Sequence, residues 1–246
     1  MTDIQYERAP ITEAVVEFKF SAKIDEKKYE KAIAQLEQVY DNHKKNVQRK
    51  VDINLDRPTN PVKGVEDTRI DSFFSNNMTQ RVVIRPDSFA VAVLAPYTCW
   101  DDFKKRILRD RDIWQKYAGF QKIDRIGMRY INRLDLPLVD GKVNLSNYVK
   151  VYPLVPTDIG TIHRYTFVVE SEIPEIGALV RLHSARVESP LPDHDGLVLD
   201  IDIFRFYEEA VNSDVLHEFL EKARINKNSI FENSITDKAR ELFGYE

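Results

Sequence analysis

The sequence predicts an α+β protein in which helices pack against a largely antiparallel sheet. Residues 11–20 and 124–137 alternate apolar and polar side chains, which is the period of a half-buried strand. Three further strand-like segments, at 162–170, 179–188 and 197–206, follow one another across short, turn-rich separators, as antiparallel neighbours do. Helical segments stand between and after these runs of strands, an arrangement typical of α+β proteins.

The other elements are predicted from periodicity and from turn residues. Tyr29, Ile33, Leu36 and Tyr40 have helical spacing and indicate an amphipathic helix over 25–43. In chain order, the sequence predicts strands at 47–55, 68–74, 80–85 and 89–94, a loop at 57–64, a helix from 98 to 119, a short helix at 144–151, and C-terminal helices over 213–243 that are interrupted or bent at 226–229.

The segment 124–137 is the sharpest chemical feature of the chain. Its two faces differ, because alternate residues of a strand point to opposite sides. One face carries Ile126, Met128, Tyr130, Asn132, Leu134 and Leu136, which we expect to pack on the core. The other face carries Arg125, Arg129 and Arg133, each four residues from the next.

The bulk composition limits the function classes. The net charge of −4 argues against a generally basic nucleic-acid binder. Charge is nevertheless uneven: residues 104–133 hold ten Lys or Arg and three Asp or Glu, whereas 170–218 hold twelve Asp or Glu and three Arg. The single cysteine, Cys99, excludes an intramolecular disulfide, and neither a signal peptide nor a membrane-spanning run is recognised. We therefore expect a cytoplasmic location and no membrane association.

We expect residues 1–246 to form a single domain. Each half of the chain runs strand, connection, several strands and helix, so the pattern suggests two pseudo-repeated β-α-β halves, 1–120 and 121–246. No residue-level repeat accompanies this pattern.

Two sequence motifs resemble those of a known family. Residues 8–18 read Arg-Ala-Pro-Ile-Thr-Glu-Ala-Val-Val-Glu-Phe, and residues 125–137 contain Arg-Tyr-Ile-Asn-Arg-Leu-Asp-Leu-Pro. Both are similar to segments of a family of proteins of about this length that is sporadically distributed among bacteria and archaea and has no established activity. The resemblance covers the chain end to end and implies no catalytic residues. Its sporadic distribution implies horizontal transfer and a role in a mobile defence or toxin-neutralising cassette.

The arginine face admits two interpretations. Arg125, Arg129 and Arg133 form a candidate anion site, because a guanidinium group presents a planar fork to phosphate or carboxylate. They are also candidates for a cross-strand ion-pair ladder, and we favour this second interpretation. The acidic counterparts are Glu13 and Glu17 on the first strand and Asp200 and Asp202 on the strand at 197–206.

The sequence shows no catalytic or metal-binding constellation. It contains no Gly-rich phosphate loop, no Gly-x-Ser-x-Gly elbow and no His-Glu-x-x-His helix. We therefore expect a non-enzymatic protein that binds a protein partner or a second copy of itself, with no cofactor. The alternative is a nucleotide- or polyphosphate-binding protein or hydrolase that uses the arginine face with Mg²⁺. A second alternative is a nucleic-acid-binding accessory protein, which would use the basic helix face formed by Lys104, Lys105, Arg106, Arg109 and Arg111.

Overall fold

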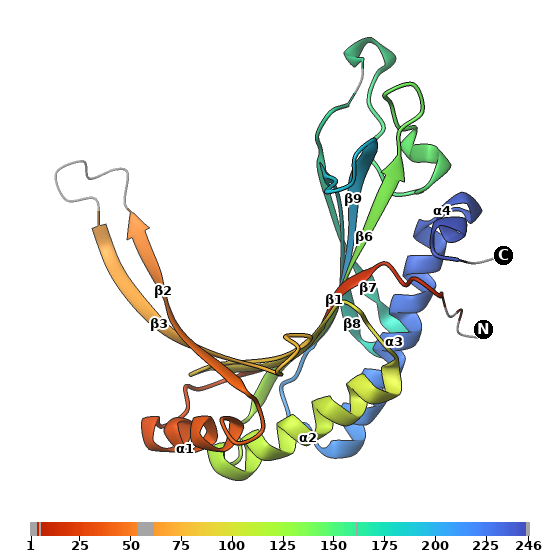
Figure 1. Cartoon of the computed structure of the whole chain (residues 1–246). Helices are drawn as coiled ribbons and strands as arrows, with labels where there is room; N and C mark the ends of the chain where they lie inside the picture. The colour runs from red at the N-terminus through yellow and green to blue at the C-terminus, as the bar shows by residue number, and fades with distance from the viewer. Residues whose placement is uncertain (1–3, 5, 54–61, 161, 245–246) are drawn as a thin grey trace. The chain divides into compact units, whose positions relative to one another are not determined.

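A single antiparallel sheet organises the fold, so the expected α+β class is confirmed. The computed structural model describes residues 4, 6–53, 62–160 and 162–244. Its nine strands follow the order β2-β3-β4-β5-β1-β6-β9-β8-β7 (Figure 1). Each half of the order is a meander of consecutive strands whose last member returns beside the first strand of that half.

The elements alternate between helices and runs of strands. In chain order they are β1 (Ile11–Phe20), α1 (Glu26–Leu36), β2 (Asn42–Ile53), β3 (Val62–Phe74), β4 (Gln80–Arg85), β5 (Ser88–Leu94), α2 (Trp100–Ala118), β6 (Ile123–Pro137), η1 (Leu145–Asn147), η2 (Thr157–Ile159), β7 (Thr166–Ile173), η3 (Pro174–Ile176), β8 (Ala178–Glu188), β9 (His194–Phe206), α3 (Ser213–Ser234) and α4 (Asp237–Leu242). The expected loop at 57–64 falls largely outside the described residues. Among the helices that the structure describes, none combines the length and apolar character needed to cross a membrane.

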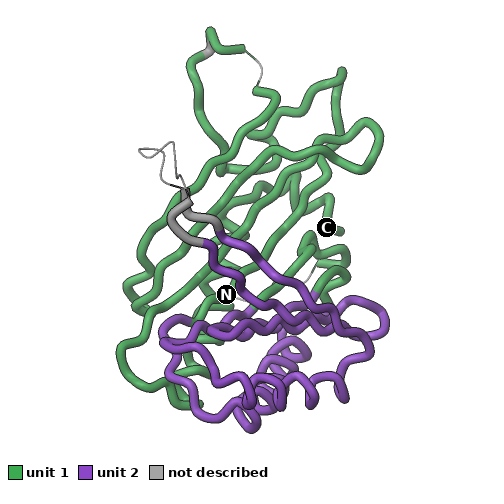
Figure 2. Tube along the Cα trace, turned by 90° about the vertical axis from the view of Figure 1, so that its left-hand side faces the viewer, with its two compact units in different colours: residues 1–15, 94–97, 126–246 green, residues 16–93, 98–125 purple. Residues whose placement is uncertain are grey.

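The chain divides into two compact units (Figure 2). Unit 1 comprises residues 1–15, 94–97 and 126–246, and unit 2 comprises 16–93 and 98–125. The expected halves, 1–120 and 121–246, were contiguous in sequence, whereas these units are not. The reason is that β1 and β6 each contribute residues to both units.

Unit 2 buries one face of its strands under α1 and α2 (Figure 1). Asp25 caps α1 by accepting hydrogen bonds from the backbone of Lys27 and Lys28. Tyr29 of α1 donates a hydrogen bond to Asp71 of β3 at 3.0 Å. Trp114 of α2 stacks on Phe89 of β5 with ring centroids 5.5 Å apart. These contacts identify the helix-covered side of the unit 2 strands.

Helix α1 is shorter than predicted, because side chains beyond its end have tertiary partners. The sequence predicted a helix to residue 43, but α1 ends at Leu36 and β2 begins at Asn42. Tyr40 donates a hydrogen bond to buried Asp110 at 2.5 Å, and His43 stacks on Phe73 with centroids 4.3 Å apart. Tertiary packing here overrides the helical period that Tyr40 extended.

The apolar face of β6 in unit 1 is buried as the sequence predicts. Met128, Tyr130, Leu134 and Leu136 are each at most 1% exposed. Asn132, the polar member of this face, donates a hydrogen bond to the backbone oxygen of Leu199 at 3.0 Å, which satisfies its buried amide.

Helix α3 is continuous where the sequence predicted an interruption or bend. It runs from Ser213 to Ser234, and Asn212 caps it by accepting from the backbone of Val215 at 2.9 Å. Within the polar run 226–229, Lys227 lies with its ammonium group 4.1 Å from the centroid of the Tyr130 ring. The run continues as helix because this lysine packs against the sheet instead of pointing to solvent.

Candidate functional site

The central arginine of β6 is paired with a buried carboxylate. Arg129 donates two hydrogen bonds to Asp200 of β9, at 2.8 and 2.5 Å. The Asp200 side chain is 7% exposed, whereas that of Arg129 is 49% exposed. Asp200, and then the charges of Asp202 and Glu13, raise the pKa of Arg129 above its ordinary value. Three of the four acidic counterparts thus act on one arginine.

The other two arginines also contact acceptors of the protein. Arg133 donates to Asp135 of its own strand at 3.1 Å and to the backbone oxygen of Glu188 at 2.5 Å. Within unit 2, Arg125 donates to Glu17 at 3.3 Å. The structure therefore joins Arg125 with Glu17 and Arg129 with Asp200, but gives Arg133 a partner on its own strand.

These pairs change what the arginine face can do chemically. A guanidinium group that is already bidentate to a buried carboxylate offers an incoming anion less than a free one would, since the anion must compete with that carboxylate. The arrangement matches the ion-pair interpretation of the face more closely than the anion-site interpretation. Within the described residues, no group of three or more His, Cys, Asp or Glu side chains is arranged to hold a metal ion.

The basic face of α2 is also partly occupied. Arg106 is buried, with 6% exposure, and donates to the backbone oxygen of Ala92. Arg109 donates to buried Asp110 at 2.8 Å. Two of the five cations expected to contact nucleic acid therefore make contacts inside unit 2. Fewer cations of α2 remain to bind phosphate groups.

A groove in unit 1 is the second candidate site. It follows the end of β6 and has a volume of about 730 Å³, within the range typical of ligand sites. Its lining comes from the last residue of β6, the segment after it, one side chain of β8 and one of α4: Pro137, Val139, Lys142, Val143, Asn144, Leu145, Ser146, Asn147, Tyr148, Tyr152, Pro153, Leu154, Val155, Gly160, Ile162, Arg186 and Lys238. These residues include no carboxylate.

Backbone contacts fix the walls of this groove. Asn144 caps η1 by accepting from the backbone of Ser146 at 3.2 Å. Beyond η1, Val149 forms a β-bridge with Ile235, and Lys150 donates its backbone N–H to Ser234 at 2.8 Å. The segment is thereby attached to the junction between α3 and α4, which brings Lys238 of α4 to the groove.

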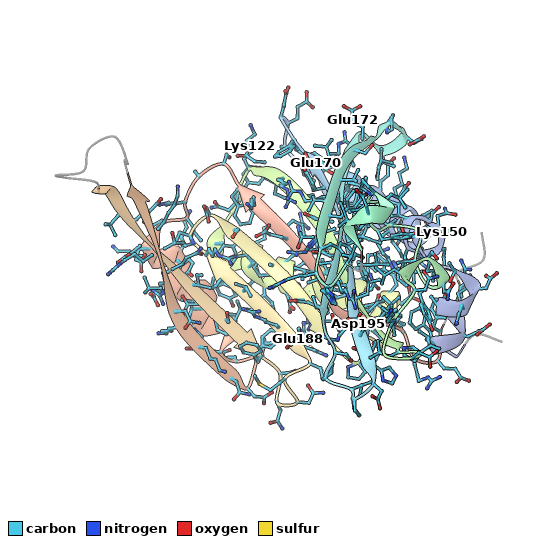
Figure 3. The ribbon with its side chains drawn as sticks, turned by 90° about the horizontal axis from the view of Figure 1, so that it is seen from above. Lys122, Lys150, Glu170, Glu172, Glu188 and Asp195 are labelled. Carbon is cyan, nitrogen blue, oxygen red and sulfur yellow. The ribbon has the colours of Figure 1, made fainter. Side chains whose placement is uncertain are left out.

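The groove combines exposed apolar side chains with two lysines. Leu154 is 86% exposed and Val139 is 66% exposed, although both are apolar. Arg186 is already engaged, because it donates to Ile162 and pairs with Asp195 of β9, which lies beside Glu188 (Figure 3). Lys238 lies 5.1 Å from the centroid of the Tyr148 ring.

In the described part of the chain, neither Lys142 nor Lys238 pairs with a carboxylate. Such a surface suits an anionic ligand with apolar groups.

Sequence reasoning missed this groove. The residues that form it come from the irregular stretch 137–162 and from distant positions on β8 and α4. The only local signal was the run Pro153-Leu-Val-Pro156, whose apolar residues have neither strand nor helix periodicity.

Comparison with known proteins adds no relationship, since no protein-family model and no curated protein matches the chain.

Proposed function

We propose that this chain is a non-enzymatic protein that binds a partner protein, and that the unit 1 groove accepts an acidic segment of that partner. One observation carries the proposal: exposed Leu154 and Val139 lie with Lys142 and Lys238, to which the described residues offer no carboxylate, around a groove lined without carboxylates. Exposed apolar side chains beside charged ones are typical of interaction surfaces. Complementary charge would guide an acidic segment to this surface and set its orientation.

The resemblance to the sporadically distributed family extends this proposal. It suggests that the partner is encoded in the same mobile cassette and that binding neutralises or regulates it. The contacts of the arginine face favour partner binding over nucleotide binding. Arg125, Arg129 and Arg133 already donate hydrogen bonds to carboxylates of the protein, and a nucleotide would have to compete with these.

Selection from a random-peptide display library tests the groove directly. We expect the wild-type protein to enrich peptides in which Asp or Glu stands beside large apolar residues. The double variant Lys142→Glu/Lys238→Glu should lose this enrichment, because it reverses both free charges of the groove.

Lys150→Glu is the matched control, since Lys150 is exposed in the same segment but does not line the groove (Figure 3). It should enrich the same peptides as the wild type. Enrichment of basic peptides, or equal losses in the control and the double variant, would contradict the proposal.

The nucleotide alternative has its own test. If Arg129 binds only Asp200, adding a nucleoside triphosphate and Mg²⁺ should leave the midpoint of thermal unfolding unchanged. A rise in midpoint that Arg129→Ala abolishes, in a variant that still folds, would replace partner binding with nucleotide binding.

A further inference from the structure

The strands of unit 2 have a second face, on which the described residues of this unit place no helix. Figure 1 shows α1 and α2 on one side of the strands. The register assigns the residues of the other side: Lys44 pairs with Ser72, Ser72 with Val83, and Val83 with Ala90. Paired residues of antiparallel strands share a face, so these four form one row across the sheet. We call this side the open face of unit 2.

The middle of the open face is built from small side chains. Ser72, Ala90 and Ala92 project little above the backbone, and Val83 adds only a short branched group. The larger side chains of this face are on β2, at the ends of β4, and at Ile70 and Phe74 of β3. Ser72, Val83, Ala90 and Ala92 are each at most 8% exposed, so a ligand on this face would contact chiefly the longer side chains around them.

Strand β2 presents only nitrogen-bearing side chains to the open face between residues 42 and 50. They are Asn42, Lys44, Asn46, Gln48 and Lys50. Amide and ammonium groups both donate hydrogen bonds to phosphate oxygens. Because strand residues rise about 3.3 Å each, Lys44 and Lys50 stand roughly 20 Å apart.

Strand β4 adds guanidinium groups, of which Arg81 is the most informative. Arg81 lies 5.4 Å from the centroid of the Phe74 ring, and Lys44 lies 5.5 Å from the same centroid. The described part of the chain gives Arg81 no carboxylate partner, and its Nε is buried without a hydrogen bond. Its Nη2 donates one long hydrogen bond, to Ser72 Oγ at 3.4 Å, so the fold supplies a neutral acceptor to which a phosphate would add a charged one.

Arg85, at the other end of β4, approaches Glu17 only to 3.9 Å. With strands about 4.8 Å apart, the cations of β2 and β4 form two rows roughly 10 Å apart on either side of β3. Two carboxylates of unit 2, those of Glu17 and Glu66, lie near basic side chains: Glu17 beside Arg125 and Glu66 beside Lys23.

From these observations we propose that the open face of unit 2 binds the phosphate backbone of a nucleic acid. Two rows of donors along the strands match a repeating, uniformly charged backbone better than the unequal side chains of an acidic peptide. This proposal goes beyond the proposed function, because it concerns a different ligand, a nucleic acid, and a different surface, on unit 2 instead of the unit 1 groove. The basic face of α2 is not required.

Fluorescence anisotropy of the full chain with labelled 20-nucleotide probes tests the proposal. We expect binding of at least one of single-stranded DNA, single-stranded RNA and duplex DNA, and the three probes distinguish these sources. Lys44→Glu/Arg81→Glu should weaken binding at least 10-fold. Losing two phosphate contacts should also reduce the slope of log Kd against log salt by about 1.5 to 2.

Lys45→Glu is the matched control, because Lys45 neighbours Lys44 on β2 but belongs to the opposite face. It reverses one charge, as the Lys44→Glu part of the double variant does, and should alter Kd less than 2-fold. Lys44→Gln changes one exposed side chain and should weaken binding about 3-fold even if replacement of Arg81 disturbs folding. Absence of binding to all three probes, equal losses in Lys45→Glu, or full competition by polyglutamate would overturn the proposal.

Discussion

Lys227 brings an ammonium group into a nearly buried position between α3 and β6. Its side chain lies against the ring of Tyr130 and is 8% exposed. Burial, and then the neighbouring charge of Arg224, lower the pKa of Lys227 to about 8. The ring of Tyr130 offsets part of this cost, since aromatic faces attract cations. The polar run in the sequence suggests a solvent-exposed lysine, which would have neither a lowered pKa nor a ring contact.

Lys227→Met should therefore stabilise the protein at pH 7, by about 1–3 kcal/mol. The folded pKa lies below the unfolded one, so between pH 8 and 10.5 the unfolded state binds more protons and stability rises with pH. The variant should lose this rise. Urea unfolding at pH 7 and pH 10 measures both effects.

Lys222→Met, in the same helix, removes an exposed lysine that pairs with Glu218 at 2.5 Å. It should change stability by less than about 0.5 kcal/mol and leave the pH dependence intact. An equal pH dependence in wild type and Lys227→Met would show that the buried ammonium does not titrate in this range.

Arg129 and Arg181 offer a second comparison between residues of one type. Arg129→Ala leaves the carboxylate of Asp200 buried and without its bidentate partner, so we expect a loss of about 2–3 kcal/mol. Arg181→Ala breaks an exposed pair with Glu170 and should cost at most about 1 kcal/mol. Chemical denaturation of both variants gives the difference, and equal costs would mean that Asp200 does not depend on Arg129.

At the scale of elements, the pairing of β8 with β9 depends on a close approach at Gly196. A Cβ atom at this position would lie 2.8 Å from the backbone oxygen of Val187 and 2.9 Å from its Cγ2. Both contacts are too short for real side chains, so even a methyl group forces the two strands apart.

Gly196→Ala should lower the free energy of unfolding by about 1–3 kcal/mol. Glu188→Ala, at the neighbouring end of β8, removes an exposed side chain and should cost less than about 0.5 kcal/mol. Thermal unfolding of the two variants compares them. A neutral Gly196→Ala would mean that this end of the strand pair opens without cost.

At the scale of the whole molecule, β1 and β6 are continuous strands that supply residues to both units. Unfolding either unit would therefore disrupt strands on which the other depends. We expect the chain to unfold in one cooperative transition.

The positions of the tryptophans make this expectation measurable. Trp100 and Trp114 are the two tryptophans of the chain, and both belong to unit 2. Ile201→Ala creates a cavity in unit 1, where Ile201 is fully buried, and should cost about 2–4 kcal/mol. In a cooperative molecule this variant shifts the tryptophan fluorescence transition as far as the circular dichroism transition. A fluorescence transition that stays at the wild-type midpoint would show that the units unfold separately.

The sequence by itself determined the α+β class, the central strand and the buried face of that strand. These features follow from local periodicity, which depends on side chains a few positions apart. The sequence predicted the boundaries of the elements less accurately. Helix α1 ends early because Tyr40 and His43 find partners in α2 and β3, and α3 continues because Lys227 finds Tyr130.

Only the tertiary structure decided what the charged residues do. The pattern of Arg125, Arg129 and Arg133 was visible in the sequence, and so were the acidic residues able to meet them. Strand register then gave Arg129 to Asp200 and left Arg81 without an acid in the described residues, while Arg133 contacts Asp135 of its own strand. Pairing depends on which strands become neighbours, and a pattern of charges along one segment does not contain that information.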